Sequence, residues 1–462
     1  MNKIDSMSPE VKKVARFIPP IKALLGGTDA MRAAGETYLP KFKSEVADEV
    51  NGQIDYERRL QSSTLVPYFE DTIKSMTGRV FYKPFTLDQL HDDVAQYADD
   101  FNAGGKSLQG VFESVFYEAL AYSRSYVVVD YSLSEEARTR AEEKAQGARP
   151  YAFKVDIDQV LDVREKNGRL TLLKYQHQVV DDEATDDFEV VYQDEIVLMT
   201  AGLTRRYRKS DKGSWYEFDS RAVKVGGKML EYVTAFELKL GRKPPLQNLA
   251  ELNIKHWQSQ SSQDNIIDTA RVPILKLTDV DANSADGIFI SGGLMLPQGA
   301  DAAYVEHSGA AIQAGQASLD KLEEQMGIAG AKLLTRTKMA LTDHQAKSES
   351  IKEVSELMLY GMILGDFMNK VIDMFGKWLG VEAGTIDITD NLKNAADSET
   401  PVNELLLAYR EGIISAQTVY ETLTAKGIID DARSYKDEME IIEIESSTRL
   451  PRFADAFGGM ED

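Results

Sequence analysis

The stretch that most constrains the fold is PPLQNLAELNIKHWQSQSSQDNIIDTA, residues 244–270. Two prolines open it and apolar side chains recur at helical spacing up to Trp257, which predicts an amphipathic helix. From Gln258 to Asn265 no side chain is apolar, yet no Gly or Pro ends the helix. A helix that runs on after losing its apolar face needs another source of stability.

Composition narrows the class of protein. The chain has 462 residues, 43% of them hydrophobic, which is enough for a large core and roughly three domain-sized units of about 150 residues each. It has no cysteine, so it carries no disulfide and no thiolate chemistry, as expected for assembly in a reducing compartment. The net charge of −22 argues against tight wrapping of nucleic acid, because Lys and Arg must neutralise the phosphates.

From the sequence we expect no membrane segment and no leader. Its start, MNKIDSMSPEVKKVARF, lacks the apolar core of a signal peptide. The longest apolar run, LMLYGMILGDFM at 357–368, is interrupted by Asp366 and is shorter than the ~20 residues that span a bilayer. We therefore expect a soluble protein made in the cytoplasm, with no membrane contact.

The pattern of apolar residues predicts an α+β protein that is mainly helical. Helical spacing dominates 1–125, and YVVVDYS at 126–132 is typical of a short buried strand. Alternating patterns separated by turn residues predict an antiparallel β segment within 150–235. Beyond it the chain is predicted to form helix, short strands and helix in turn, at 244–270, 272–307 and 310–334.

A long helix is expected after these segments. Thr342 is a candidate N-cap, with Gln345 three residues on as the reciprocal cap, and the apolar stripe continues to Leu379. At 1.5 Å per residue this helix would be ~50 Å long, far beyond the usual ~11–12 residues. It would have to support something large. A smaller unit of three helices is expected at 401–445.

The glycine-rich stretch GGKS at 104–107 invites comparison with a phosphate-binding loop. That motif needs a glycine five residues before Gly105, where Asp100 stands instead. It also needs a strand ahead of it, and the preceding segment is an acidic helix. A helix stop with a charged cap is the better interpretation.

Carboxylates are numerous but do not form a catalytic pattern. DVDANSADG at 279–287 has calcium-loop spacing at its first positions, but Ser284 and Ile290 replace the required Gly and Glu, which favours a polar turn. Adjacent aspartates diverge on a helix or turn, so the pairs at 92–93, 99–100, 181–182 and 186–187 indicate solvated acidic faces. The five histidines are scattered. We expect no enzyme, cofactor or metal site.

Several stretches, in this order, resemble the portal proteins of tailed bacteriophages. No single stretch is a catalytic motif; the resemblance rests on the order in which all of them occur over most of the chain. They are GGTDAMRAAGETYLPKF (26–42), YERRLQSSTLVPYFEDTIKSMTGRVFYKPF (56–85), PPLQNLAELNIKHWQSQSSQDNIIDTARVPIL (244–275), LDKLEEQMGIAGAKLL (319–334) with LTDHQAKSE (341–349), and LLLAYREGIISAQTVYETLTAKGII (405–429).

The resemblance implies a portal fold assembled as a cyclic ring, usually of twelve subunits, at one vertex of the capsid. DNA would be pumped through its axis by the terminase and would later leave the same way. Carried onto this chain, the implied parts are a wing at 1–243, stem helix 1 at 244–270, a clip at 271–309, stem helix 2 at 310–333, a tunnel loop at 334–344, a long wing helix at 345–400, and a crown with the C-terminal tail at 401–462.

The resemblance also assigns three groups of site residues. Stem helix 1 would line the channel with neutral polar side chains, which form no ion pairs with sliding phosphates: Gln258, Gln260, Ser261 and Gln263. The tunnel loop would surround the DNA with the cations Arg336 and Lys338, together with Thr335 and Thr337. The clip tip would contact the terminase or a tail adaptor through Asp279, Asp281, Asn283 and Asp286.

Each assignment has an ordinary alternative. The polar run of 258–265 could be a fraying helix end that lines nothing, and TRTKMAL at 335–341 could be a surface turn with two solvated cations. For the whole chain, a head–tail adaptor ring is the alternative function. A metal-dependent nuclease of the packaging apparatus would need converging carboxylates, which the sequence does not place together.

The expected setting follows from the resemblance. The chain would be a component of the virion, located at the portal vertex and assembled in the host cytoplasm. Its expected partners are further copies of itself, the terminase large subunit, the major capsid and scaffolding proteins, a head–tail adaptor, and double-stranded DNA that passes without sequence preference.

Overall fold

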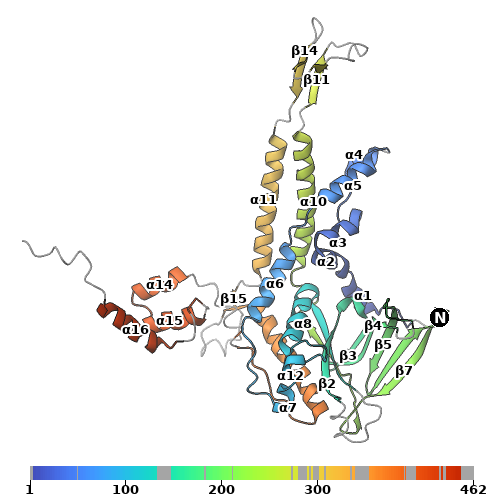
Figure 1. Cartoon of the computed structure of the whole chain (residues 1–462), viewed down its shortest axis with the longest axis vertical. Helices are drawn as coiled ribbons and strands as arrows, with labels where there is room; N and C mark the ends of the chain where they lie inside the picture. The colour runs from blue at the N-terminus through green and yellow to red at the C-terminus, as the bar shows by residue number, and fades with distance from the viewer. Residues whose placement is uncertain are drawn as a thin grey trace, which may run out of the picture.

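The computed structural model describes the greater part of the chain, and Figure 1 shows its arrangement. The described residues form a mainly helical α+β fold, as predicted from the sequence. They comprise 4–48, 50–132, 147–181, 184–210, 212–271, 274–278, 289–290, 293–294, 301–305, 309–332, 336–338, 353–389, 391, 402–425, 428–429 and 433–448.

A three-stranded antiparallel sheet lies in the centre of the body. Its middle strand is β1 (Arg124–Tyr131), which pairs with β10 (Ala235–Lys239) on one side and with β2 (Pro150–Val155) on the other. All residues from Ser125 to Asp130 are buried. A strand covered on both faces needs apolar residues on both, which explains the continuous apolar run that marks it in the sequence.

Two helices pack against this sheet and supply much of the core. They are α8 (Leu108–Tyr122) and α12 (Glu356–Leu379). Phe112 of α8 meets Phe367 of α12 edge to face, with the ring centroids 6.2 Å apart. The helix α8 ends at Ser123, whose φ of 72° lies in the left-handed region where glycine is usual.

A five-stranded antiparallel meander flanks the central sheet and confirms the β segment predicted for 150–235. Each strand pairs with the next along the chain, so every connection is a hairpin. The strands are β3 (Val160–Lys166), β4 (Arg169–Val180), β5 (Tyr192–Thr200), β6 (Leu203–Lys209) and β7 (Trp215–Ala222), and the pair β8 (Lys224–Val225) and β9 (Lys228–Met229) follows them.

The first hundred residues form mostly short helices, of which α1 to α5 lie beside α10 on the side away from α11 (Figure 1). The helices α5 and α6 are separated by the non-helical residues 63–67, where Ser63 is extended. We call α4 and α5 the arm. The elements are α1 (Pro9–Ala15), α2 (Ile18–Leu25), α3 (Gly27–Ala34), η1 (Gly35–Thr37), α4 (Lys43–Ala47), α5 (Gly52–Ser62), α6 (Tyr68–Val80), α7 (Asp92–Ala95) and η2 (Ala98–Asp100); η3 (Ile157–Gln159) lies between β2 and β3.

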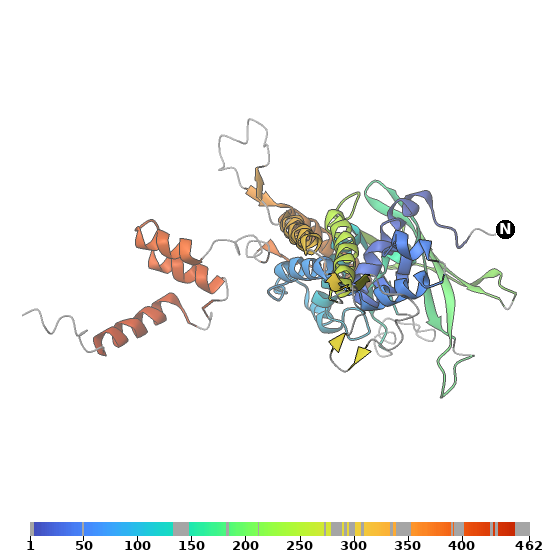
Figure 2. The ribbon, with the colours of Figure 1, turned by 90° about the horizontal axis from the view of Figure 1, so that it is seen from above.

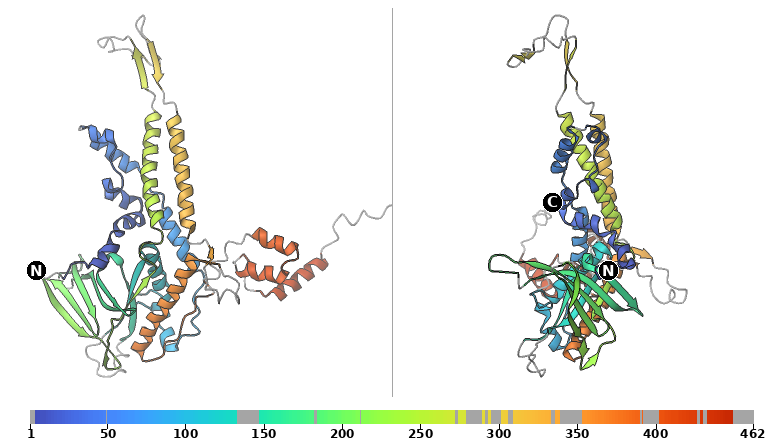
Figure 3. Two further views of the ribbon diagram at one scale, coloured as in Figure 1. Left: turned by 180° about the vertical axis from the view of Figure 1, so that it is seen from behind. Right: turned by 90° about the vertical axis from the view of Figure 1, so that its right-hand side faces the viewer.

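Two long helices leave the body side by side (Figures 1 and 3). They are α10 (Gln247–Ala270) and α11 (Ala310–Ala331), so the helices predicted for 244–270 and 310–334 are confirmed, with slightly shorter ends. Their far ends carry the antiparallel pair β11 (Ile274–Thr278) and β14 (Asp301–Val305). A second short pair joins β12 (Phe289–Ile290) to β13 (Gly293–Leu294).

The predicted long helix begins later than the sequence indicates. Thr342 and Gln345 lie outside the described residues, and 353–355 form a strand, β16 (Glu353–Ser355), rather than helix. The hydroxyl of Ser355 accepts the Met358 N–H at 3.2 Å and caps α12 there. The prediction of a helix from 345 was therefore wrong: 24 residues rise ~36 Å, not ~50 Å.

Three helices near the C-terminus form a separate group, as predicted for 401–445. They are α14 (Val402–Arg410), α15 (Ala416–Ala425) and α16 (Tyr435–Thr448), and α15 contacts both others. Figure 1 places them to one side of the body. None of the described helices is long and apolar enough to cross a membrane.

Candidate functional site

The structure describes two of the three predicted groups of site residues. The clip residues Asp279, Asp281, Asn283 and Asp286 all lie outside the described residues, as does Thr335 of the tunnel segment. The predictions for these five positions therefore stay predictions. The tunnel segment and the polar run of α10 can be compared with the structure.

The predicted tunnel loop contains a strand. Arg336, Thr337 and Lys338 form β15, which pairs with β16 in antiparallel register. Lys338 stands opposite Glu353 at the end of the ladder. The backbone at these two cations is therefore held in a ladder that joins directly to α12, so residues 336–338 form a strand rather than the loop that the sequence predicts.

The polar run of α10 faces the inside of the subunit at two of the four predicted positions. Ser261 and Gln263 are buried, so they cannot line a water-filled channel, and this part of the prediction was wrong. The Ser261 hydroxyl accepts a hydrogen bond from Arg59 at 3.3 Å and contacts the Ser63 hydroxyl at 2.8 Å. The Gln263 amide donates to the Ile312 carbonyl of α11 at 2.8 Å.

The other two predicted channel residues are half-buried. The Gln258 amide donates to the carbonyl of Tyr38 at 3.0 Å, and the Gln260 amide donates to Asp264 at 2.8 Å, one turn along the same helix. Only Gln258 of these two is tied to another segment. The helix therefore continues past Trp257 because polar side chains, rather than apolar ones, attach it to its surroundings.

Arg59 is the centre of the polar contact between the arm and α10. Its guanidinium forms two hydrogen bonds to the Glu45 carboxylate, at 2.7 and 2.8 Å, and a third to the Pro40 carbonyl at 2.9 Å. The side chains of Arg59 and Glu45 are only 3% and 6% exposed. The Phe42 ring lies 3.9 Å from the guanidinium carbon and covers it. Such a bidentate, desolvated pair fixes geometry strongly.

The electrostatics of this contact favour an ionised carboxylate. Burial on its own raises the pKa of Glu45, but the Arg59 guanidinium and the Phe42 N–H more than offset that effect, so the pKa is lowered. The Phe42 amide donates to Glu45 at 2.6 Å, which closes the first turn of α4. The arm is therefore locked to α10 by charge and hydrogen bonds.

Two further polar residues of α10, both buried, contact neighbouring segments. Asn253 is fully buried; its carbonyl oxygen accepts the Phe69 N–H and its amide donates to the Val66 carbonyl, both at 3.0 Å. These bonds satisfy a carbonyl of the non-helical chain between α5 and α6 and an N–H in the first turn of α6, where backbone groups without partners would be costly. His256 lies 3.2 Å from Glu323 of α11.

The helices α10 and α11 approach each other closely at a glycine. A Cβ on Gly315 would lie 2.0 Å from the Gln263 side-chain oxygen, so no larger residue fits there without movement. Leu319, Leu322 and Met326 of α11 are buried along the same side. The two helices thus form one unit through an apolar stripe with polar contacts at Gln263 and His256.

Sequence reasoning missed Arg59, Glu45 and Asn253. The sequence does carry a signal for Arg59. Tyr56, Arg59 and Ser63 follow one another at helical spacing, and all three are buried, so Arg59 lies on the buried side of this segment. A charged residue on a buried stripe indicates a satisfied ion pair. No pattern in the sequence links Asn253 to residues almost two hundred positions earlier.

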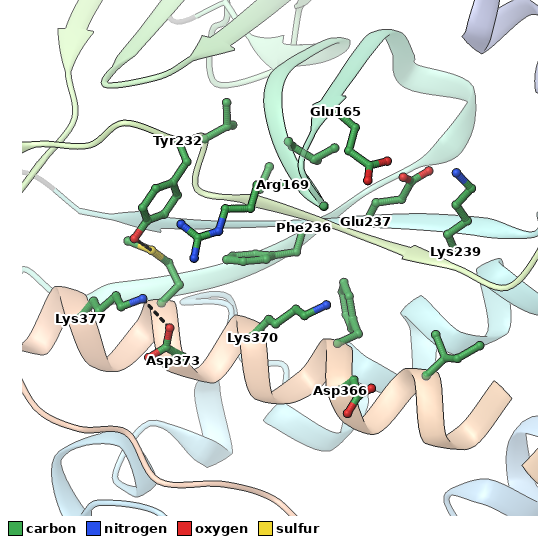
Figure 4. A pocket seen from close by; sticks show the side chains of 17 residues that line it. Glu165, Arg169, Tyr232, Phe236, Glu237, Lys239, Asp366, Lys370, Asp373 and Lys377 are labelled. Carbon is green, nitrogen blue, oxygen red and sulfur yellow. Dashed lines mark hydrogen bonds and ion pairs between the residues drawn. The ribbon is translucent and has the colours of Figure 1, made fainter. Parts of the chain in front are cut away.

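A cavity of about 480 Å³ lies between α12, β10 and the β3–β4 hairpin (Figure 4). Asp373 and Lys377 form an ion pair at 2.5 Å within it, and Arg169 lies over the Tyr232 ring. The charges that line it are balanced between four acidic and four basic side chains: Glu165, Glu237, Asp366, Asp373, Arg169, Lys239, Lys370 and Lys377. This mixture does not select a ligand of either sign.

The glycine-rich stretch at 104–107 is a structural turn. The Gly105 N–H donates to Asp100 at 2.7 Å, and the Gly104 and Lys106 N–H groups donate to Asn102 at 2.9 and 2.8 Å. The amides that a phosphate would need are therefore already bonded. Among the described residues, no group of three or more acidic, His or Cys side chains is arranged to hold a metal.

Comparisons with known proteins add limited information. A family model described as a domain of unknown function (DUF4055) matches residues 245–379, which run from α10 to the end of α12 and make up less than a third of the chain. No curated protein matches.

Three similar solved structures come from gene transfer agent particles. The virion of a native particle and the neck of an empty particle computed with C6 symmetry each give a TM-score of 0.36 at 12% identity, covering 78% of this chain and 90% of theirs. The neck of a native particle computed with C12 symmetry gives 0.33 at 12% identity, covering 78% and 89%. Scores this low do not establish a shared fold.

Proposed function

We propose that this chain is the subunit of a ring-shaped, non-enzymatic DNA channel of the portal type. The observation that carries the proposal is the pair α10 and α11, which leaves the body and bears the strands β11 and β14 at its far end (Figure 1). A helix out, a strand pair at the tip and a helix back is the order of stem, clip and stem that the sequence resemblance implies.

The projecting pair also supports assembly. A helix pair with a two-stranded sheet at its tip buries little surface, and two strands alone are marginally stable in water. One whole side of α11 is exposed. Copies placed around an axis would cover these surfaces, because a head-to-tail contact that closes generates a ring.

The proposed contact with DNA lies at β15. Arg336 and Lys338 sit on the ladder that leads into α12, in a chain whose net charge is −22. A ring would present one set of these cations per subunit, and they would contact phosphates without reading sequence. The acidic remainder of the chain would keep the DNA from adhering, so that it can slide.

The other partners follow from the same geometry. The far ends of α10 and α11 would meet the terminase during packaging and a head–tail adaptor afterwards, while the body would sit among the capsid and scaffolding proteins at one vertex. The chain would then be a virion component assembled in the host cytoplasm.

Native mass measurement and end-on electron microscopy of the purified protein test this proposal. Twelve copies of the 51.5 kDa chain weigh about 620 kDa, and we expect a closed ring near this mass with an open centre. A neighbouring subunit number would still support the proposal. Only monomers or dimers across concentrations would contradict it.

A further inference from the structure

The tip of the arm exposes three apolar side chains that nothing in the described part of the chain covers. Val46, Val50 and Ile54 are 67%, 80% and 55% exposed. They follow one another at four-residue intervals around the turn from α4 to α5. We call them the tip patch. Single exposed apolar residues are ordinary, but three of them on the tip of one projecting element indicate a contact surface.

The tip has a defined conformation. The Asp48 carboxylate accepts the N–H groups of Val50 and Asn51 at 3.0 and 2.9 Å, which fixes the turn. A Cβ on Gly52 would lie 1.9 Å from the Glu45 carbonyl oxygen, so α4 and α5 are in direct contact there. The Arg59–Glu45 lock holds the base of this unit on α10. The tip patch is therefore presented on a fixed support.

The opposite side of the molecule offers a matching surface. The residues of α11 that face α10, including Leu319, Leu322 and Met326, are spaced by three and four. A second series with the same spacing lies on the far side of the helix and is exposed: Ala310, Ala314, Ala317, Lys321, Glu324 and Ile328. We call it the outer stripe. A helix with two such series is suited to packing on both sides.

The two surfaces lie at the same level on opposite sides of α10. Figure 1 places the arm beside the outer half of the helix pair, on the side away from α11, and the view from above agrees (Figure 2). Rotation of a second copy about an axis parallel to α10 and α11 would bring the arm of one copy to the α11 of the next. Such a contact joins unlike surfaces, and it generates a ring when the rotation between copies closes.

The register is set by charge. Both α5 and α11 run toward the body from their outer ends, and both rise ~1.5 Å per residue. If Ile54 packs on Ala317, Glu57 lies one residue, about 1.5 Å, from the level of Lys321, and Arg58 lies three residues, about 4.5 Å, from the level of Glu324. All four charged side chains are exposed, and the pairs have opposite signs.

We propose that the tip patch of each arm docks on the outer stripe of α11 of the neighbouring copy, with Ile54 against Ala317. This inference rests on the proposed ring and names the surfaces that join its subunits. The partner is thus a second copy of this chain, recognised by small apolar side chains and two complementary charge pairs.

The chain has no cysteine, so cross-linking can test the contact on a clean background. The variant carrying Ile54→Cys and Ala317→Cys should form, on oxidation, a ladder of covalent oligomers up to the full ring. Ile54→Cys with Gln316→Cys is the matched control: Gln316 is exposed beside Ala317 but points about 100° away around the helix. It should give little cross-linking.

Three outcomes would overturn the inference. Rings of normal mass in which the Ala317 pair cross-links no better than the Gln316 control would refute this contact and leave the proposed ring intact. Equal maleimide labelling of Ile54→Cys in rings and in monomers would show that the tip stays exposed and serves another partner. The absence of rings from the wild-type chain would overturn both this inference and the proposed function.

Charge reversal provides an independent measurement. Glu57→Lys should place two cations together and raise the concentration needed for half-assembly by about fivefold, and Lys321→Glu should restore it in the double variant. Additive effects of the two changes, without restoration, would argue against this register.

Discussion

Arg59→Ala is expected to release the arm from α10. The change removes two hydrogen bonds to Glu45, one to the Pro40 carbonyl and one to the Ser261 hydroxyl. The Glu45 carboxylate would then stay almost fully buried with the Phe42 N–H as its remaining donor in the contacts described above. Removing one partner of a buried pair typically costs about 3–5 kcal/mol. Because the Phe42 N–H still donates to Glu45, we expect a cost near the lower end of that range, about 3 kcal/mol.

Hydrogen exchange is the appropriate assay, because a chain of this size does not unfold in one step. The backbone amides of α4 and α5 should exchange about a hundredfold faster in Arg59→Ala, which corresponds to about 3 kcal/mol in local opening. Arg58→Ala is the matched control, measured on unassembled protein: the Arg58 side chain is 75% exposed and pairs only with Asp55 in the contacts seen here. That surface pair is worth at most about 0.5 kcal/mol.

Adding Glu45→Gln to Arg59→Ala separates the effect of losing the Arg59–Glu45 ion pair from a general loss of packing in the arm. The neutral amide costs less to bury without a partner than a carboxylate, so the double variant should recover part of the lost protection. Equal exchange rates in Arg59→Ala and Arg58→Ala would show that Arg59 does not hold the arm on α10. A double variant that loses as much protection as Arg59→Ala and Glu45→Gln lose separately, added together, would show the same.

Three further predictions concern other parts of the chain. Burial raises the pKa of Glu118 despite Lys154 nearby, so the folded state binds a proton more readily than the unfolded chain. The stability of the folded state should therefore fall as the pH rises from about 4.3, the usual Glu pKa, through the raised pKa of Glu118. In Glu118→Gln, the melting temperature should depend less on pH over this range. Ser123→Gly relieves a left-handed backbone and should stabilise the body by about 1 kcal/mol, whereas Ser125→Gly, in extended β1, should not; equal shifts in melting temperature would contradict this. Arg336→Ala with Lys338→Ala should leave ring mass unchanged but lower the DNA content of particles or let DNA leak, with a difference that depends on salt; equal content and retention at every salt concentration would show that these cations do not touch DNA.

The sequence predicts the elements of this fold well where periodicity is strong. Apolar residues in a continuous run identify β1, and the alternating segments identify the meander, because each pattern follows directly from which faces of a strand are covered. The helix at 244–270 is also predicted despite its polar half, because no residue in it breaks a helix.

Element ends and polar contacts are harder to predict. The sequence predicts that the long helix begins at Thr342, yet Ser355 caps α12; both residues are suitable N-caps by type. The resemblance places Ser261 and Gln263 on the channel wall, where polar residues would be exposed, but both are buried. Their burial depends on Arg59 and Ile312, which are distant in sequence, so no local pattern reveals it.

The central claim is that duplex DNA passes through a ring of this chain. A cryo-electron microscopy reconstruction of the vertex of a DNA-filled particle tests it most directly. We predict a column of duplex density along the ring axis, with the backbone of 336–338 as its nearest protein neighbour and α10 and α11 arranged around it. Density for DNA that stops short of the ring, a centre closed by protein, or a vertex that lacks this chain would contradict the account.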